Sequence, residues 1–240
     1  MQTEIRNAQG EKIDYTFHSG GESASATMLI GHGVTGNKDR AHLVALAEGL
    51  ASNGVNALRF SFAGNGESEG TFGNCTITKE VTDLNAVINA TSEEGGILYY
   101  TGHSMGGAVG VITAAQDDRL RGLVSLAGMV DCEKFAETEF GEEKSGFMWE
   151  EKDCPLTRTY MDDMAAVGTI VDTGSEISIP WLLVHGTEDD VVLIQDSNDI
   201  YAEANEPKQL HVIGGADHSF NEPAHRDEMV ETVVNWVNEI

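Results

Sequence analysis

Three residues that lie far apart in this sequence could together activate a hydroxyl group for attack on a carbonyl carbon. The segment GHSMG (102–106) fits the pattern G-x-S-x-G, with Ser104 at its centre. A serine hydroxyl is a poor nucleophile unless a neighbouring base takes its proton. His218 is expected to be that base and Asp189 the acid that orients its imidazole, because the order serine, acid, histidine is one in which such triads occur. The spacing therefore predicts nucleophilic acyl chemistry.

The acid has close rivals in the sequence. Glu188, Asp189 and Asp190 are consecutive, and Asp217 directly precedes the expected base. A triad acid has to accept a hydrogen bond from the imidazole while it holds the correct tautomer. We predict that Asp189 has this role, with Asp190 as the alternative.

Two backbone N–H groups are expected to stabilise the oxyanion that forms during attack. One is that of Met105, which follows the nucleophile at the start of a predicted helix, where the helix dipole favours negative charge. The other is expected in the segment GHGVTG (31–36), with Val34 as the donor and His32 as a brace of the loop.

The elements that must carry these residues alternate along the chain. Short apolar runs predict strands at 26–33, 56–62, 97–102, 122–128, 180–186 and 209–215, after a hairpin of strands at 2–7 and 12–18. Helical spacing of apolar residues predicts helices at 39–52, 77–91, 105–116, 193–204 and 224–238. Such alternation is typical of an α/β fold with a mostly parallel central sheet and helices on both faces.

The interval 131–178 interrupts the alternation of strands and helices. It is acidic and rich in aromatic and methionine residues, and a segment this long between two core strands is expected to form a lid or cap. We therefore predict one domain, 1–240, with an inserted cap at about 131–178. Phe147, Met148 and Trp149 are the predicted substrate-binding residues, although the same side chains could instead pack the cap onto the body.

Composition limits the partners of the protein. The chain has 40 acidic and 14 basic residues, for a formal net charge of −26, which disfavours nucleic acids and membrane surfaces as partners. The polar N-terminus lacks the pattern of a signal peptide, so cytoplasmic residence is expected.

The three cysteines match neither a disulfide framework nor a zinc site, and the glycines of 64–70 predict a turn in preference to a dinucleotide loop. We expect no metal, no cofactor and a small-molecule substrate.

Five segments together resemble the α/β-hydrolase superfamily, in particular its small esterase/lipase-like serine hydrolases such as the feruloyl and cinnamoyl esterases. HGVTGNKD is similar to their oxyanion segment. RFSFAGNGESEGTFGN resembles their segment R-F-D-F-x-G-x-G-x-S-x-G, with Ser61 in place of the usual aspartate. GHSMGG, HGTEDDVV and GADHSF resemble their nucleophile, acid and base segments. The resemblance covers about residues 25–236 and implies an α/β-hydrolase fold with a short inserted cap.

The same resemblance implies the reaction. The expected activity is hydrolysis of small to medium neutral esters, aromatic acyl esters among them, through an acyl-enzyme intermediate. A thioesterase, an acyltransferase or a peptidase could use the same triad. A ligand-binding receptor with little turnover is the alternative from outside the enzymes, since a fold by itself does not determine a function.

Overall fold

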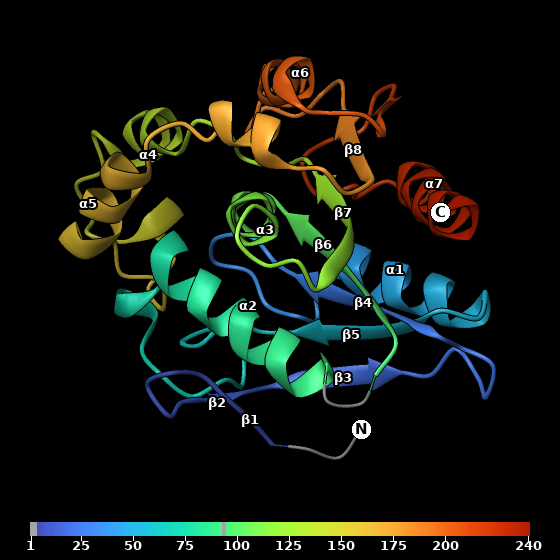
Figure 1. Cartoon of the computed structure of the whole chain (residues 1–240). Helices are drawn as coiled ribbons and strands as arrows, with labels where there is room; N and C mark the ends of the chain where they lie inside the picture. The colour runs from blue at the N-terminus through green and yellow to red at the C-terminus, as the bar shows by residue number, and fades with distance from the viewer. Residues whose placement is uncertain (1–3, 93–94) are drawn as a thin grey trace.

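The computed structural model describes residues 4–92 and 95–240, whose main feature is a seven-stranded sheet in the order β3-β5-β4-β6-β7-β8-β9 (Figure 1). Every neighbouring pair is parallel except β3 and β5. The strands are β3 (Tyr15–His18), β4 (Ala26–Gly31), β5 (Asn56–Phe60), β6 (Ile97–His103), β7 (Leu120–Leu126), β8 (Trp181–Gly186) and β9 (Lys208–Ile213). The predicted parallel sheet is thus confirmed.

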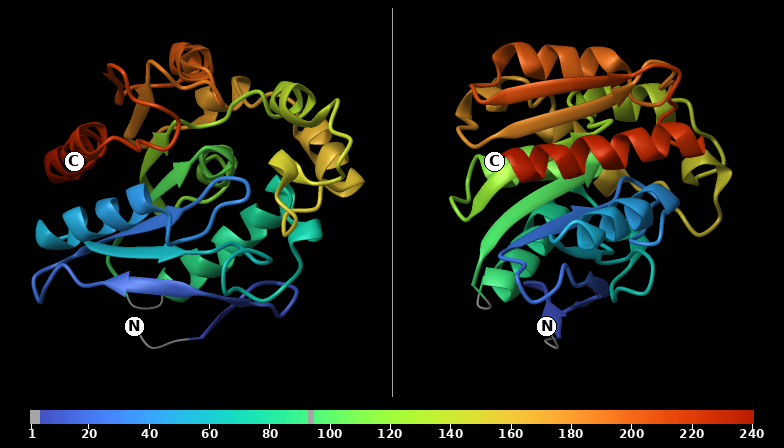
Figure 2. Two further views of the ribbon diagram at one scale, coloured as in Figure 1. Left: turned by 180° about the vertical axis from the view of Figure 1, so that it is seen from behind. Right: turned by 90° about the vertical axis from the view of Figure 1, so that its right-hand side faces the viewer.

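Helices cover both faces of this sheet (Figure 2). The helices that pack against the sheet are α1 (Ala41–Ser52), α2 (Ile77–Ser92), α3 (Met105–Ala114), α6 (Ile194–Glu203) and α7 (Pro223–Glu239). Successive side chains of a strand point to opposite faces, so Ile30 packs in the cluster of α1 and α7, whereas Leu29 packs in that of α2 and α3. Both faces of β4 are buried, which is why its sequence is a continuous apolar run. The helices and strands that were predicted from residue 26 onward begin and end within two residues of their predicted limits.

The N-terminal hairpin differs from its prediction. β1 (Ile5–Arg6) pairs antiparallel with β2 (Lys12–Ile13), as expected, but β3 leaves this pair and joins the large sheet beside β5. The change of partner occurs at Asp14, whose N–H donates to Ser68 Oγ at 2.8 Å and whose carbonyl accepts from Ser61 N–H at 2.9 Å. A single strand over 12–18 is therefore wrong, and residues 2 and 3 of the other predicted strand lie outside the described residues.

The interval between β7 and β8 contains four short helices, α4 (Cys132–Phe140), η2 (Met148–Glu150), α5 (Arg158–Val167) and η3 (Asp172–Glu176). α4 and α5 pack against each other, and α5 also contacts α2 (Figure 1). Most of the aromatic and methionine side chains of the interval are buried in the same core cluster as α2 and α3; they are Phe135, Phe140, Met148, Tyr160 and Met164. Packing therefore accounts for most of this apolar composition. Among the described residues, no helix is long and apolar enough to cross a membrane.

Candidate active site

Ser104 lies at the sharp turn between β6 and α3. Its backbone has φ 54° and ψ −121°, a conformation that residues with a side chain rarely adopt. Three hydrogen bonds hold the turn: the Ser104 N–H donates to Leu126 O at 3.0 Å, and the Ser104 carbonyl accepts from Gly107 N–H at 2.8 Å and Met129 N–H at 3.0 Å. Because β7 and the segment after it supply two of these contacts, the sheet itself fixes the position of the serine.

Asp189 is the acid that contacts His218. Asp189 Oδ2 accepts a hydrogen bond from His218 Nδ1 at 2.8 Å, and Oδ1 accepts from the N–H groups of Val191 and Val192 at 3.0 and 2.9 Å. Burial alone would raise the pKa of this carboxyl, but hydrogen bonds from His185 and His218 outweigh burial and hold the pKa well below its usual value. The carboxylate is therefore ionised and presents one oxygen to the imidazole.

The rival acids lie elsewhere. Glu188 and Asp190 are exposed, whereas the Asp189 side chain is fully buried. Asp217 accepts from the N–H and the side-chain amide of Asn221 at 2.9 and 2.8 Å. Of the four acidic residues considered from the sequence, Asp189 is thus the one that the fold places against His218.

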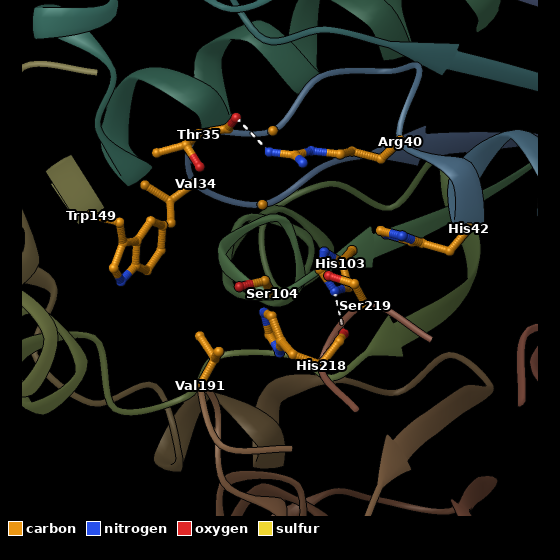
Figure 3. Close-up of a pocket in the computed structure, with 12 residues that line it drawn as sticks. Val34, Thr35, Arg40, His42, His103, Ser104, Trp149, Val191, His218 and Ser219 are labelled. Carbon is orange, nitrogen blue, oxygen red and sulfur yellow. Dashed lines mark hydrogen bonds between the residues drawn. The ribbon is translucent and has the colours of Figure 1, made fainter. Parts of the chain in front are cut away.

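A cavity of about 330 Å³ opens over the serine. Figure 3 shows the Ser104 side chain in the middle of this cavity with the His218 ring beside it. The cavity is lined by Gly33, Val34, Thr35, Gly36, Arg40, His42, His103, Ser104, Trp149, Val191, His218 and Ser219. Its size is within the range of pockets for small molecules.

The segments that carry the predicted oxyanion donors both lie next to the nucleophile. A Cβ atom on Gly33 would come within 2.6 Å of Ser104 Cβ, so the loop that carries Val34 approaches the serine as closely as backbone atoms allow. Met105 is the first residue of α3. In the described part of the chain, the backbone N–H groups of Val34 and Met105 make no hydrogen bond to another residue. Both N–H groups are thus free to donate hydrogen bonds to a developing oxyanion.

His32 braces this loop, as expected. Its Nδ1 donates to Gly33 O at 2.8 Å, and its Nε2 accepts from Phe62 N–H at 3.0 Å. One nitrogen that donates and one that accepts describe a neutral imidazole. Burial lowers the pKa of His32 to about 4, which agrees with that state.

Two further histidines reach the site without having been predicted. His103 Nε2 donates to the backbone carbonyl of His218 at 2.8 Å, and the ring of His42 lies 4.4 Å from that of His103, centroid to centroid. Burial lowers the pKa of both, that of His42 to about 3, so both are neutral. His103 occupies a variable position of the G-x-S-x-G motif, and no sequence pattern distinguishes His42. Only the folded chain shows that His103 holds the loop of the predicted base.

The predicted substrate-binding residues separate in the structure. Trp149 lines the cavity, at a backbone φ of 47°, and its Nε1 donates to Glu139 Oε2 at 2.8 Å. Met148 is buried and instead lines a narrow enclosed space behind Val34. Phe147 lies outside both sets of lining residues. Among the additional lining residues, Arg40, Thr35, Val191 and Ser219 carried no signal in the sequence.

The cysteines form neither a metal site nor a disulfide. All three are free and buried, and burial raises the pKa of Cys75 and Cys132 to about 12 and that of Cys154 to about 11. Their thiols are therefore protonated and unreactive. Within residues 4–92 and 95–240, no group of three His, Cys, Asp or Glu side chains could hold a metal ion.

Known sequences identify the relationship. The sequence profile of the prolyl oligopeptidase family (Peptidase_S9) matches residues 50–240. The Salmonella typhi protein named "Uncharacterized protein YfhR" is 31% identical over 205 residues, which are 82% of this chain and 65% of that protein. The protein of the same name from Escherichia coli K12 is 26% identical over 230 residues, covering 90% and 73% of the two chains. This chain thus spans slightly less than two thirds of the Salmonella typhi relative.

Known structures confirm the fold. Est1E from Butyrivibrio proteoclasticus, solved with ferulic acid bound, superposes with a TM-score of 0.86 at 24% identity, over 99% of this chain and 98% of that one. Mouse alpha/beta hydrolase domain-containing protein 10 gives a TM-score of 0.80 at 18% identity, again over 99% and 98%. The predicted α/β-hydrolase fold and the resemblance to that superfamily are therefore confirmed.

Proposed function

We propose that this chain, which belongs to the prolyl oligopeptidase family, is a serine hydrolase that cleaves small to medium esters through an acyl-enzyme intermediate. One observation carries the proposal: the His218 imidazole is hydrogen-bonded through Nδ1 to buried Asp189 and opens, with Ser104, on a single cavity. A nucleophile, a base and an orienting acid in this arrangement are what acyl transfer requires.

The chemistry follows from these positions. Ser104 Oγ attacks the ester carbonyl carbon while His218 Nε2 takes the hydroxyl proton, and Asp189 keeps the proton on Nδ1 and stabilises the imidazolium. The N–H groups of Val34 and Met105 donate to the tetrahedral oxyanion. His218 then returns its proton to the leaving alcohol oxygen, which leaves an acyl group on Ser104. A water molecule deprotonated by His218 attacks that acyl group and releases the acid.

The residues that line the cavity favour esters of limited size as substrates. The side chains of Trp149, Val34 and Val191 offer an apolar surface next to Ser104 (Figure 3). We assign the acyl group to this surface, and ferulic acid bound to Est1E supports aromatic acyl groups among the candidates. Trp149 comes from the interval 131–178, so we further propose that this interval acts as a cap that selects substrates on a single α/β-hydrolase domain.

Peptide hydrolysis is the second candidate, because the matching family profile is that of prolyl oligopeptidases. The amine of a peptide bond is a poorer leaving group than an alcohol, and its nitrogen must be protonated by His218 before the C–N bond breaks. A matched pair of substrates, the p-nitrophenyl ester and the p-nitroanilide of one acyl group, separates the two activities by their relative kcat/KM.

The test of the proposed function is hydrolysis of p-nitrophenyl esters from acetate to decanoate by the wild type and by Ser104→Ala. We expect turnover that peaks at one chain length and falls by at least about 10³-fold in the variant. Ser23→Ala, an exposed serine remote from the cavity, is the control and should match the wild type. Equal rates for wild type and Ser104→Ala would refute serine catalysis. Tight binding of an ester without turnover would favour a receptor instead.

A further inference from the structure

The active-site cavity has two chemically different ends (Figure 3). Trp149, Val34 and Val191 lie at one end, and Arg40, His42 and Ser219 lie toward the other, with Ser104 between them. None of the residues that line the cavity is acidic, although the chain has 40 acidic and 14 basic residues. An anion at the polar end would therefore meet no carboxylate among the residues that line the cavity.

Arg40 has unused donors at this end. One terminal nitrogen donates to Thr35 O at 3.0 Å, which lays the side chain along the cavity (Figure 3). The adjacent carboxylate, Asp39, is engaged by Arg59 and Lys38 instead. Throughout the described residues, no carboxylate lies within ion-pair distance of the Arg40 guanidinium. A guanidinium has five N–H donors in a planar fork, so most of those of Arg40 remain available for a ligand.

His42 provides a second, independent observation. The residue is 3% exposed and lines the same cavity, yet its Nε2 has no hydrogen-bond partner in the part of the chain that the structure describes. A buried polar nitrogen without a partner is costly, and a ligand atom would satisfy it. The charge nearby is mixed: Arg40 and Arg226 lower the pKa of His42 and Asp217 raises it, but the Asp217 carboxylate is held by Asn221.

We propose that Arg40 and His42 bind a carboxylate carried by the alcohol part of the ester, so that the substrates are acyl esters of hydroxy acids. This inference rests on the proposed function. His218 returns its proton to the leaving oxygen, so the alcohol part lies beside His218, and Ser219, the next residue, lines the polar end. A carboxylate fits better than a phosphate dianion, because Arg40 is the only lysine or arginine among the lining residues and the net charge of −26 repels multivalent anions.

The experiment compares two isosteric esters, the acetyl ester of ε-hydroxyhexanoic acid and that of its primary amide. In the wild type we expect kcat/KM to be roughly three- to fivefold higher for the carboxylate, through a lower KM. Arg40→Gln should bring this ratio to about one, and Arg40→Lys should keep part of the preference. Taking the ratio removes any general effect of losing the contact with Thr35. The preference should also shrink as salt is added.

Arg158→Gln is the matched control. It removes the same charge from a side chain that is 91% exposed on α5 and pairs with Asp162, so the wild-type ratio should persist. A ratio that is unchanged in Arg40→Gln, or a wild type that favours the amide, would overturn the carboxylate site while ester hydrolysis stands. A wild type that hydrolyses the p-nitrophenyl esters but neither of these two esters would overturn this inference alone, whereas one that hydrolyses none of them would refute the proposed function as well.

Discussion

The loops at the edge of the sheet and the interval 131–178 both line the active-site cavity, but they are held in different ways. At the sheet edge, Ser104 is held by hydrogen bonds to the backbone of the next strand and the segment after it, and Asp189 by backbone N–H groups of its own loop. Trp149, from the interval, is 38% exposed, and its indole donates to Glu139 of the same interval. The sheet thus fixes the groups that we propose to react, whereas the interval 131–178 largely holds Trp149 through contacts of its own.

Aromatic packing within the interval 131–178 holds Trp149 in place. The Phe140 ring lies 5.0 Å from that of Trp149 and 6.0 Å from that of Tyr160, centroid to centroid. Phe140 and Tyr160 are buried, so they anchor Trp149 at the edge of the cavity. Under the proposed function, this difference would make the reaction and its selectivity structurally separable. Substitutions at the sheet edge should change the rate, and those in the interval should change substrate choice or stability.

The largest effect is expected at the acid. Asp189→Asn removes the acceptor that holds the His218 tautomer, so kcat should fall by about 10⁴-fold. Asp190→Asn changes an exposed neighbour and should leave kcat near the wild-type value. Steady-state kinetics on the preferred p-nitrophenyl ester measures both. The reverse result would make Asp190 the acid, and the acid would then be an exposed residue instead of the buried Asp189.

A smaller loss is expected when the oxyanion loop is displaced. Gly33→Ala places a methyl group 2.6 Å from Ser104 Cβ, which forces the loop of Val34 away, and kcat should fall by roughly 10²-fold. Gly214→Ala is the matched control, because a Cβ there meets no atom within 4 Å. If Gly33→Ala kept full activity with an unchanged melting temperature, Val34 would not be an oxyanion donor.

Two neighbouring residues of the interval test the separation of stability from selectivity. Met148 is 2% exposed, and Met148→Ala should lower the free energy of unfolding by at least about 2 kcal/mol. Trp149→Ala should leave the melting temperature nearly unchanged and shift the preferred acyl chain length, with KM rising several-fold for the best ester. Thermal melts and the chain-length series measure the two effects. An unchanged chain-length profile in Trp149→Ala would exclude the tryptophan from the substrate site.

The last prediction concerns the contact between the interval 131–178 and α2. Glu80 of α2 is buried beside Tyr160, and its Oε2 has no hydrogen-bond partner among residues 4–92 and 95–240. Burial, together with nearby Asp83, raises the pKa of Glu80 well above its usual value. The folded state therefore keeps this proton after the unfolded chain has lost it. The free energy of unfolding is therefore highest, as far as Glu80 is concerned, below about pH 4.5. It falls by about 1.4 kcal/mol per pH unit as the pH rises from there toward the pKa of Glu80 in the folded state.

Glu80→Gln removes this proton linkage. The variant should unfold at a higher temperature than the wild type at neutral pH, and the difference should narrow toward pH 4.5, as melts across that range would show. Glu231→Gln, an exposed glutamate on α7, should reproduce the wild-type dependence. If the melting temperatures of the wild type and Glu80→Gln changed in parallel with pH, Glu80 would ionise in the folded state as it does in the unfolded chain.

Much of the fold could be predicted because its signals are local. A buried parallel strand is a short apolar run and a helix repeats its apolar residues every three or four positions, so element limits from β4 onward came within two residues. The N-terminal hairpin was predicted only in part, because the backbone of Asp14 bonds to Ser61 and Ser68, which lie more than forty residues further along the chain. No local pattern reports such a partner.

The sequence by itself determined which residues follow the strands, and therefore placed Ser104, Asp189 and His218 at one edge of a parallel sheet. The tertiary structure alone decided which of several acids meets the imidazole, that His103 holds the loop of His218, and that Trp149 reaches the cavity while Phe147 does not. It also decided that Arg40 lines the cavity with no carboxylate partner among the described residues. Element order and strand ends are properties of neighbouring residues, whereas contacts between loops depend on strand register and on the packing of distant segments.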